Sequence, residues 1–179
     1  DNKLIFFDPV DLKGKWKQEF ANSNPIHLEI GAGKGRFATT MAERNPDINF
    51  VAVEMEAGAF VYASRLFSES EQENIRGIRT LAQKLLDYFE EQEVDKIYIN
   101  FCNPWPKNRQ HKRRLTHPRQ LEIYKKILKE DATIDLKTDD LDFFKDSIDY
   151  FEKTGFEITE LDYNLSADKD GNIVTEYES

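Results

Sequence analysis

The sequence predicts an α/β fold: a Rossmann-like, doubly wound and mostly parallel sheet that ends in a late antiparallel hairpin. Three observations support this prediction. Strand-length apolar segments alternate with helical ones, a glycine-rich turn joins a strand to a helix, and polar side chains recur where strands end. Repeated β-α units imply a parallel sheet with helices on both faces, and in that architecture ligands bind at the carboxyl ends of the strands.

The first predicted unit is a strand that begins at Ile26, enters a turn with glycine at every second position, and continues into a helix over residues 36–44. Gly31, Gly33 and Gly35 let the backbone turn sharply and lie close to a ligand. The loop lacks the third glycine of the dinucleotide pattern, since Arg36 and Phe37 follow. A single-nucleoside cofactor with a charged amino-acid tail, S-adenosylmethionine, therefore suits it better than NAD.

Two acids accompany that loop. The next strand, residues 49–54, ends in Glu54. This is about 20 residues past the glycines, where nucleoside-binding folds place the carboxylate that takes the ribose hydroxyls. Glu29 is a poor residue for a buried strand. We expect it either to contact the cofactor or to accept hydrogen bonds from the amides of its own loop.

The remaining elements alternate in the same way. Thr116 is expected to cap a helix that has Pro118 in its first turn. The last two expected strands, separated by a polar turn, form the antiparallel hairpin. The expected helices cover residues 57–68, 83–90 and 141–153, and the expected strands cover 75–79, 96–101, 132–137, 156–163 and 173–177.

The strand over residues 96–101 leads into the segment that says most about function. Two prolines bracket Trp105 in a rigid turn, which can hold the ring at the sheet edge as a stacking platform. Five cations follow in a chain whose formal net charge is −9, namely Lys107, Arg109, Lys112, Arg113 and Arg114. A basic patch beside a planar side chain is what a nucleotide with its phosphates requires. The alternatives are a Trp105 packed under the turn and a solvated face of cations.

Composition limits the other possibilities. The chain of 179 residues is 39% hydrophobic, which is enough for a core, so we expect residues 1–179 to form a single domain. The longest apolar runs have strand length, and nothing resembles a secretory signal, so no membrane association is expected. Cys102 is the only cysteine, which excludes an internal disulfide and fits a cytoplasmic protein. No histidine has metal-ligand spacing to a partner, so no metal is expected.

Several motifs, in the same order along the chain, resemble those of the bacterial tRNA (guanine-N7-)-methyltransferase family from about Gly14 to the last residue. They are Leu28-Glu29-Ile30-Gly31-Ala32-Gly33-Lys34-Gly35-Arg36-Phe37, Val53-Glu54, Asn103-Pro104-Trp105-Pro106-Lys107, His111-Lys112-Arg113-Arg114-Leu115, Lys137-Thr138-Asp139 and Thr175-Glu176-Tyr177-Glu178. The resemblance implies a class I S-adenosylmethionine-dependent fold whose acceptor is a guanine in the variable loop of tRNA, in a monomer or homodimer.

The residue chemistry and the resemblance together give the expected site roles; the resemblance itself supplies those of Glu29, Glu54, Lys107, Asp139 and residues 175–178. Catalysis is expected from Asn103 and Asp139. The cofactor is expected to contact Glu29, Gly31, Gly33, Gly35, Glu54, Leu81, Ala82 and Asn103. The tRNA is expected to contact Trp105, Lys107, Arg113, Arg114, Asp139, Thr175, Glu176, Tyr177 and Glu178. From the residues alone, Asp139 has a second interpretation as the N-cap of the helix over residues 141–153.

Two positions depart from the family pattern. Asn103 stands where the family usually has Asp, and Leu81-Ala82 stands where it usually has Asp-Ala. An Asn-Pro-aromatic turn also resembles the loop of exocyclic-amine methyltransferases, although those have a second Pro where this chain has Trp105. Two alternatives therefore stay open: an exocyclic-amine nucleic-acid methyltransferase, and a tRNA-binding paralogue that has lost catalysis.

Overall fold

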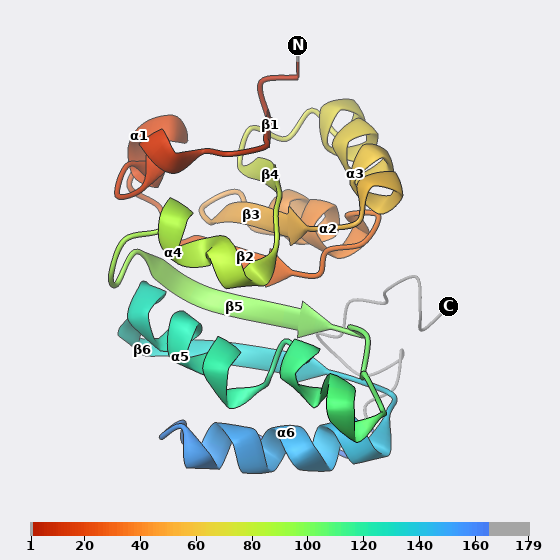
Figure 1. Ribbon diagram of the computed structural model, residues 1–179. Helices are drawn as coiled ribbons and strands as arrows, with labels where there is room; N and C mark the ends of the chain where they lie inside the picture. Colours follow the sequence, from red (N-terminus) through yellow and green to blue (C-terminus); the bar gives the residue numbers. More distant parts are fainter. Residues whose placement is uncertain (1, 165–179) are drawn as a thin grey trace.

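The protein is built on one six-stranded sheet, described by a computed structural model over residues 2–164. The strand order is β1-β4-β3-β2-β5-β6, and every pairing is parallel. Figure 1 shows the strands stacked in this order from β4 down to β6, with α6 beyond them at the bottom. The strands are β1 Ile5–Phe6, β2 Ile26–Ile30, β3 Asn49–Glu54, β4 Ile75–Arg79, β5 Val94–Asn100 and β6 Leu128–Lys137.

The chain adds strands in two directions from the middle of the sheet. From β2 it proceeds through β3 and β4 on one side, and then it returns to place β5 and β6 on the other. The strand order therefore reverses between β2 and β5. In open α/β sheets, ligands bind at such a reversal, outside the carboxyl ends of the strands.

Helices cover both faces of the sheet, which explains why the residues of β3 are buried throughout. One face is covered by α2 and α3, whose buried residues include Phe37 and Phe67. The other is covered by α1, α4 and α5, with Trp16 and Tyr124 in its core. The helices are α1 Trp16–Glu19, α2 Arg36–Arg44, α3 Ala57–Glu69, α4 Leu85–Tyr88, α5 Pro118–Ile127 and α6 Leu141–Lys153, and short 3-10 turns form η1 Val10–Leu12, η2 Ala82–Lys84 and η3 Asn108–Arg113.

The doubly wound parallel sheet confirms the predicted fold class. Two local predictions differ from the structure. The expected cap Thr116 is buried and hydrogen-bonds the Ser147 hydroxyl at 2.8 Å. The helix instead starts at Pro118 with His117 as its N-cap, whose Nδ1 accepts from the Arg119 amide. The predicted helix over residues 83–90 is only a 3-10 turn followed by the single turn α4.

The late antiparallel hairpin is not present in the described residues. Residues 156–164 form no strand, and the second expected strand, residues 173–177, lies outside the described part of the chain. The short strand β1 was not predicted, because two residues give no periodicity to read. Among residues 2–164, no helix has the length and apolar character needed to cross a membrane.

One half-buried histidine makes stability depend on pH. His27 on β2 lies against the rings of Phe50 and Tyr98, and its Nδ1 is 3.3 Å from the Tyr98 hydroxyl. Burial, together with the charge of Lys96, lowers the pKa of His27 to about 4, while Asp95 and Asp135 oppose this shift only in part.

We expect the free energy of unfolding to fall as the pH is lowered from about 6.5 to about 4. In this range His27 is protonated in the unfolded chain but stays neutral in the folded protein. Urea unfolding across this range should show a shallower pH dependence in His27→Gln than in the wild type. His111→Gln, which alters a histidine in η3 outside the sheet, serves as the control. Identical slopes in the wild type and His27→Gln would contradict this account.

Candidate active site

The glycine turn is held against the end of the neighbouring strand. The amides of Gly31 and Ala32 both donate to the Val53 carbonyl, at 2.9 and 3.0 Å. Gly31, Gly33 and Gly35 have φ of +78°, +57° and +82°, in the left-handed region that favours glycine. The backbone path after β2 therefore depends on glycine at these positions.

The three glycines do not serve one purpose. A Cβ on Gly35 would lie 2.7 Å from a ring carbon of Phe67 and 3.0 Å from Ala63. Gly35 thus also lets α2 approach α3, so packing gives a second reason for glycine at this position. A Cβ on Gly31 would meet only Leu115, at 3.4 Å. This part of the turn is less crowded by side chains than Gly35.

Glu54 organises the turn from the end of β3. Its two carboxylate oxygens accept from the amides of Gly33 and Glu56, each at 2.8 Å. The side chain is largely buried. Glu56 then caps α3 by accepting from the amides of Gly58 and Ala59, and these bonds lower the pKa of Glu56. The sequence indicated Glu54 by position but gave no sign that its carboxylate shapes the loop.

A second polar pair lies where the strand order reverses. Glu29 on β2 and Asn100 at the end of β5 are 4% and 6% exposed, and the Asn100 amide donates to a Glu29 oxygen at 3.3 Å. The carbonyl oxygen of Asn100 is buried and accepts no hydrogen bond within residues 2–164. Asn100 was not among the predicted site residues, although a polar residue at the end of an apolar strand is a usable signal.

The turn after β5 has unusual backbone geometry. Phe101 and Trp105 have φ of +51° and +46°, a region that side chains rarely adopt. The Asn103 side-chain oxygen accepts from the Trp105 amide at 3.0 Å, and the Phe101 amide donates to the Lys137 carbonyl at 2.8 Å. Residues with positive φ cluster at functional sites, where neighbouring contacts hold them. Asn103 itself is exposed.

Four of the five predicted cations are exposed, and Arg113 lies over the Trp105 ring at 5.1 Å. The fifth, Arg114, differs from the prediction. Its side chain is 2% exposed and binds Asp146 within the fold. This burial argues against the predicted contact between Arg114 and RNA. The exposed members are Lys107, Arg109, Lys112 and Arg113.

The end of β6 decides between the two interpretations of Asp139. The cap of α6 is Asp140, whose carboxylate accepts from the Phe143 amide at 2.8 Å. Asp139 is exposed and makes no hydrogen bond or ion pair with any described residue. Asn100 and Lys137 are register partners, so the turn that bears Asn103 and the segment that bears Asp139 leave the same edge of the sheet. The expected substrate residues Thr175, Glu176, Tyr177 and Glu178 lie outside the described residues.

Exposed apolar side chains stand at the other end of this edge. Leu81 follows β4 and Met55 follows β3, and they are 46% and 56% exposed. Ala82, by contrast, is buried, and its carbonyl accepts from the Gln120 amide. The sequence indicated Leu81 but not Met55. The usable signal for Met55 was its position as an apolar residue directly after the strand-end acid Glu54.

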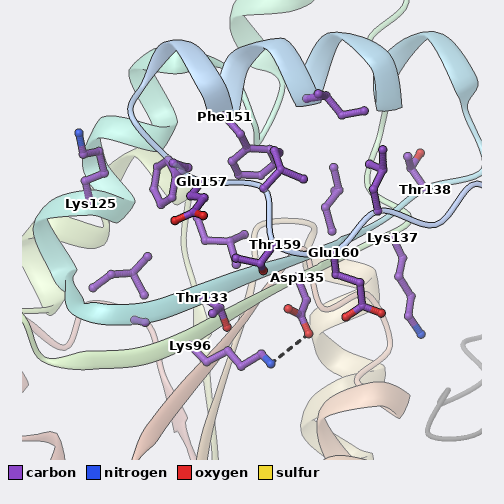
Figure 2. A pocket seen from close by; sticks show the side chains of 18 of the residues that line it. Lys96, Lys125, Thr133, Asp135, Lys137, Thr138, Phe151, Glu157, Thr159 and Glu160 are labelled. Atoms are coloured by element: carbon purple, nitrogen blue, oxygen red, sulfur yellow. Dashed lines mark ion pairs between the residues drawn. The ribbon is translucent and has the colours of Figure 1, made fainter.

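Three other features bear on what else the protein could do, namely the Cys102 thiol, groups of metal-ligating residues and a groove beside β6. Burial raises the pKa of the Cys102 thiol to about 12, so it stays protonated at neutral pH. Residues 2–164 bring together no group of acids, His or Cys suited to a metal. A groove of about 1560 Å³ lies between β6, α6 and residues 156–163. Figure 2 shows the Lys96–Asp135 ion pair in it, along with Lys137. It runs along β6, and its lining includes no residue of the glycine turn but does include Phe101 of the turn after β5, as well as Thr138 and Asp139 after β6.

A parallel sheet of this order, with a glycine turn after β2 and an acid ending β3, is the Rossmann-like arrangement of nucleoside-binding proteins, a class that includes the S-adenosylmethionine-dependent methyltransferases. Solved structures agree on the fold. An antibiotic-related methyltransferase superposes with a TM-score of 0.65 at 15% identity, over 82% of this chain and 76% of that one. A precorrin-6y C5,15-methyltransferase from Geobacter metallireducens gives 0.61 at 16% identity, over 74% of this chain and 62% of that one.

Sequence comparison narrows the class to a family. Residues 23–179 match the model of a family described as "Putative methyltransferase". The chain is 46% identical to a tRNA (guanine-N(7)-)-methyltransferase from Clostridium tetani, over 99% of this chain and 85% of the relative. Identity to the protein of the same name from Clostridium acetobutylicum is 45%, over 98% and 84%. The chain belongs to the tRNA (guanine-N7-)-methyltransferase family, which confirms the resemblance seen in the sequence.

The site has the kinds of groups that S-adenosylmethionine requires. The turn at Gly31 presents backbone, Glu54 offers a carboxylate with lone pairs beyond its two amide bonds, and Met55 and Leu81 offer apolar surface. These features meet at one edge of the sheet, on neighbouring strands. The residues present therefore fit the cofactor.

We expect Glu54→Gln to weaken S-adenosylmethionine binding by about 1–3 kcal/mol, because a charge-assisted acceptor is removed and one of the two amides then faces an NH₂ group. Titration calorimetry measures the change. Glu69→Gln, an exposed substitution at the end of α3, should bind like the wild type. Unchanged affinity in Glu54→Gln would show that this carboxylate is not part of the cofactor site.

Proposed function

We propose that the protein transfers a methyl group from S-adenosylmethionine to N7 of a guanine in the variable loop of tRNA, as one domain spanning residues 1–179 that acts in the cytoplasm. One observation carries the proposal. The turn that bears Trp105 and its cations leaves the sheet at the switch point beside the glycine turn. A nucleotide bound there would stand next to the cofactor residues.

The reaction requires that the guanine be positioned and that its developing positive charge be stabilised, and it requires no proton transfer before the attack. Guanine N7 carries a free lone pair, so no base has to remove a proton before it attacks the methyl group. Bound S-adenosylmethionine supplies that methyl group on a positively charged sulfur. The chain has to hold the purine in line with it and offset the positive charge that develops on the ring.

The residues divide this work between two parts of the sheet edge. Around β2 and β3, Glu54 would accept from the ribose hydroxyls, and Glu29 would attract the cofactor's amino group. Met55 and Leu81 would flank the adenine, which would compensate for the acid that the family usually has at the Leu81 position. Apolar packing of this kind is typical of small-molecule sites.

Around β5 and β6, Trp105 offers a face for the target base. Asn103 holds the turn through its bond to the Trp105 amide, a bond that an Asp would make equally well. Because Asn103 brings no charge, the carboxylate that offsets the developing cation is that of Asp139. Its exposure and its position next to the helix cap leave it available for this role.

The experiment that tests the function is methyl transfer from tritiated S-adenosylmethionine to bulk tRNA, followed by mapping of the product. N7-methylguanosine makes RNA labile to borohydride and aniline, so we expect chain cleavage at one variable-loop position. Label that resists this cleavage would favour an exocyclic amine as acceptor. Cofactor binding without transfer to any tRNA would point to a paralogue without catalysis.

Removing the charge at Asp139 should slow chemistry more than binding. We expect Asp139→Asn to lose about 1–2 kcal/mol of transition-state stabilisation, which is roughly a five- to thirtyfold slower single turnover. Asp142→Asn, an exposed acid in the first turn of α6, is the matched control. Single-turnover rates at saturating cofactor and tRNA decide the question, and equal rates in both variants would remove Asp139 from the mechanism.

The basic turn should govern the salt dependence of tRNA binding. We expect the double variant Lys107→Ala, Arg113→Ala to bind tRNA more weakly. Its log–log salt dependence should flatten by up to roughly 0.7–0.9 for each phosphate that the variant no longer neutralises. Its cofactor affinity should not change. The control removes the same charge at two exposed lysines outside η3, Lys17 and Lys126. An equal effect in both double variants would show that only net charge matters.

A further inference from the structure

Arg114 behaves unlike the cations beside it. It ends the run Lys112-Arg113-Arg114, in which the first two side chains are exposed, whereas the Arg114 side chain is 2% exposed. Guanidinium groups are rarely buried, because removing them from water is costly. A buried arginine in the middle of a basic surface motif calls for a reason other than phosphate binding.

Its contacts join two separate elements. The Arg114 Nε donates to the Pro104 carbonyl at 2.8 Å. Its Nη1 donates to an Asp146 carboxylate oxygen at 2.7 Å and to the Tyr150 hydroxyl at 3.0 Å. The guanidinium also lies over the rings of Phe143 and Tyr150, at 5.4 and 6.0 Å. One side chain thus binds the turn after β5 and two successive turns of α6.

Both elements carry groups of the proposed reaction. Pro104 lies between Asn103 and Trp105, and α6 starts at Leu141, directly after Asp139 and its cap Asp140. A planar guanidinium donates in fixed directions, so it sets the distance and orientation between its partners in a way that an ammonium cannot. The Asp146 side chain is 46% exposed, so water screens its ion pair with Arg114 and the pair adds little net stability. Geometry is therefore the property that this contact supplies best.

We propose that Arg114 is a positioning residue, which holds the Trp105 turn against α6 and so sets the target base relative to Asp139 without touching tRNA. This rests on the proposed function, since it assigns the turn to the base and Asp139 to the developing charge. A base displaced by about 1 Å can lose two orders of magnitude in rate, so a loosened turn should slow the chemical step.

Two substitutions separate positioning from phosphate binding. Arg114→Lys keeps the cation and loses the planar fork, and Asp146→Ala removes the acceptor on α6 while making the protein less acidic. Positioning predicts that single turnover at saturating tRNA and cofactor slows by about tenfold or more in both, with tRNA affinity unchanged. A phosphate contact predicts a near wild-type rate in Arg114→Lys and tighter tRNA binding in Asp146→Ala. That second pattern would overturn the proposal.

Two control variants test whether a general loss of stability in α6 could slow the reaction. Asp149→Ala removes an acid of α6 that pairs with Lys153 on the surface of the same helix. Ser147→Ala removes the buried bond between α6 and Thr116, which involves no residue of the Trp105 turn. Both should turn over like the wild type at a temperature where thermal unfolding shows every variant folded. A slowed Ser147→Ala would mean that any loosening of α6 has this effect, which overturns a specific role for Arg114.

A readout without substrate keeps the proposal separate from the proposed function. Trp16 is fully buried, so acrylamide quenches mainly Trp105, the other tryptophan. Quenching should increase in Arg114→Lys and Asp146→Ala but not in Asp149→Ala or Ser147→Ala. If the wild type methylated no tRNA, the proposed function would fail, and this comparison alone would still decide the positioning role. Equal quenching in all variants would refute it.

Discussion

The carboxylate of Glu54 is the contact on which the candidate site depends. By accepting from the amides of Gly33 and Glu56 it joins the turn after β2 to the start of α3. A largely buried carboxylate needs such donors, since an unpaired charge would be costly. The same group that shapes the loop is thereby fixed where a cofactor ribose would lie. In the proposed cofactor role of Glu54, one side chain would couple the loop conformation to ligand binding.

The opposite part of the sheet edge uses a cation in an equivalent way. The turn after β5 has two residues at positive φ, a conformation that costs free energy unless neighbouring groups hold it. Within the turn, the Asn103 side chain accepts from the Trp105 amide, and Arg114 fixes the turn to α6 by donating to the Pro104 carbonyl. A negative group organises the half proposed for the cofactor, and a positive group organises the half proposed for the RNA. Glu54 and Arg114 are both buried, whereas the neighbouring side chains proposed to bind the ligands, such as Leu81 and Lys107, are exposed.

Charge distribution also reconciles an acidic protein with a nucleic-acid substrate. The formal net charge is −9, which by itself would repel RNA. The exposed cations of η3 and the turn before it concentrate opposite charge at one place, beside an aromatic ring. Repulsion elsewhere and attraction here would orient an approaching tRNA toward the site, an effect that salt screens.

The sequence alone determined the alternation of strands and helices from β2 to α6, apart from the short α4, together with the glycine turn, the strand-end position of Glu54 and the basic turn with Trp105. These follow from local periodicity, turn chemistry and charge, which neighbouring residues decide. Only the tertiary structure separated Arg114 from Arg113, gave Gly35 a packing role against Phe67, and made Asp140 the helix cap in place of Asp139. These outcomes depend on contacts between residues far apart in the chain or on the path of the backbone. No local pattern encodes which of two adjacent arginines meets a helix that begins 27 residues later.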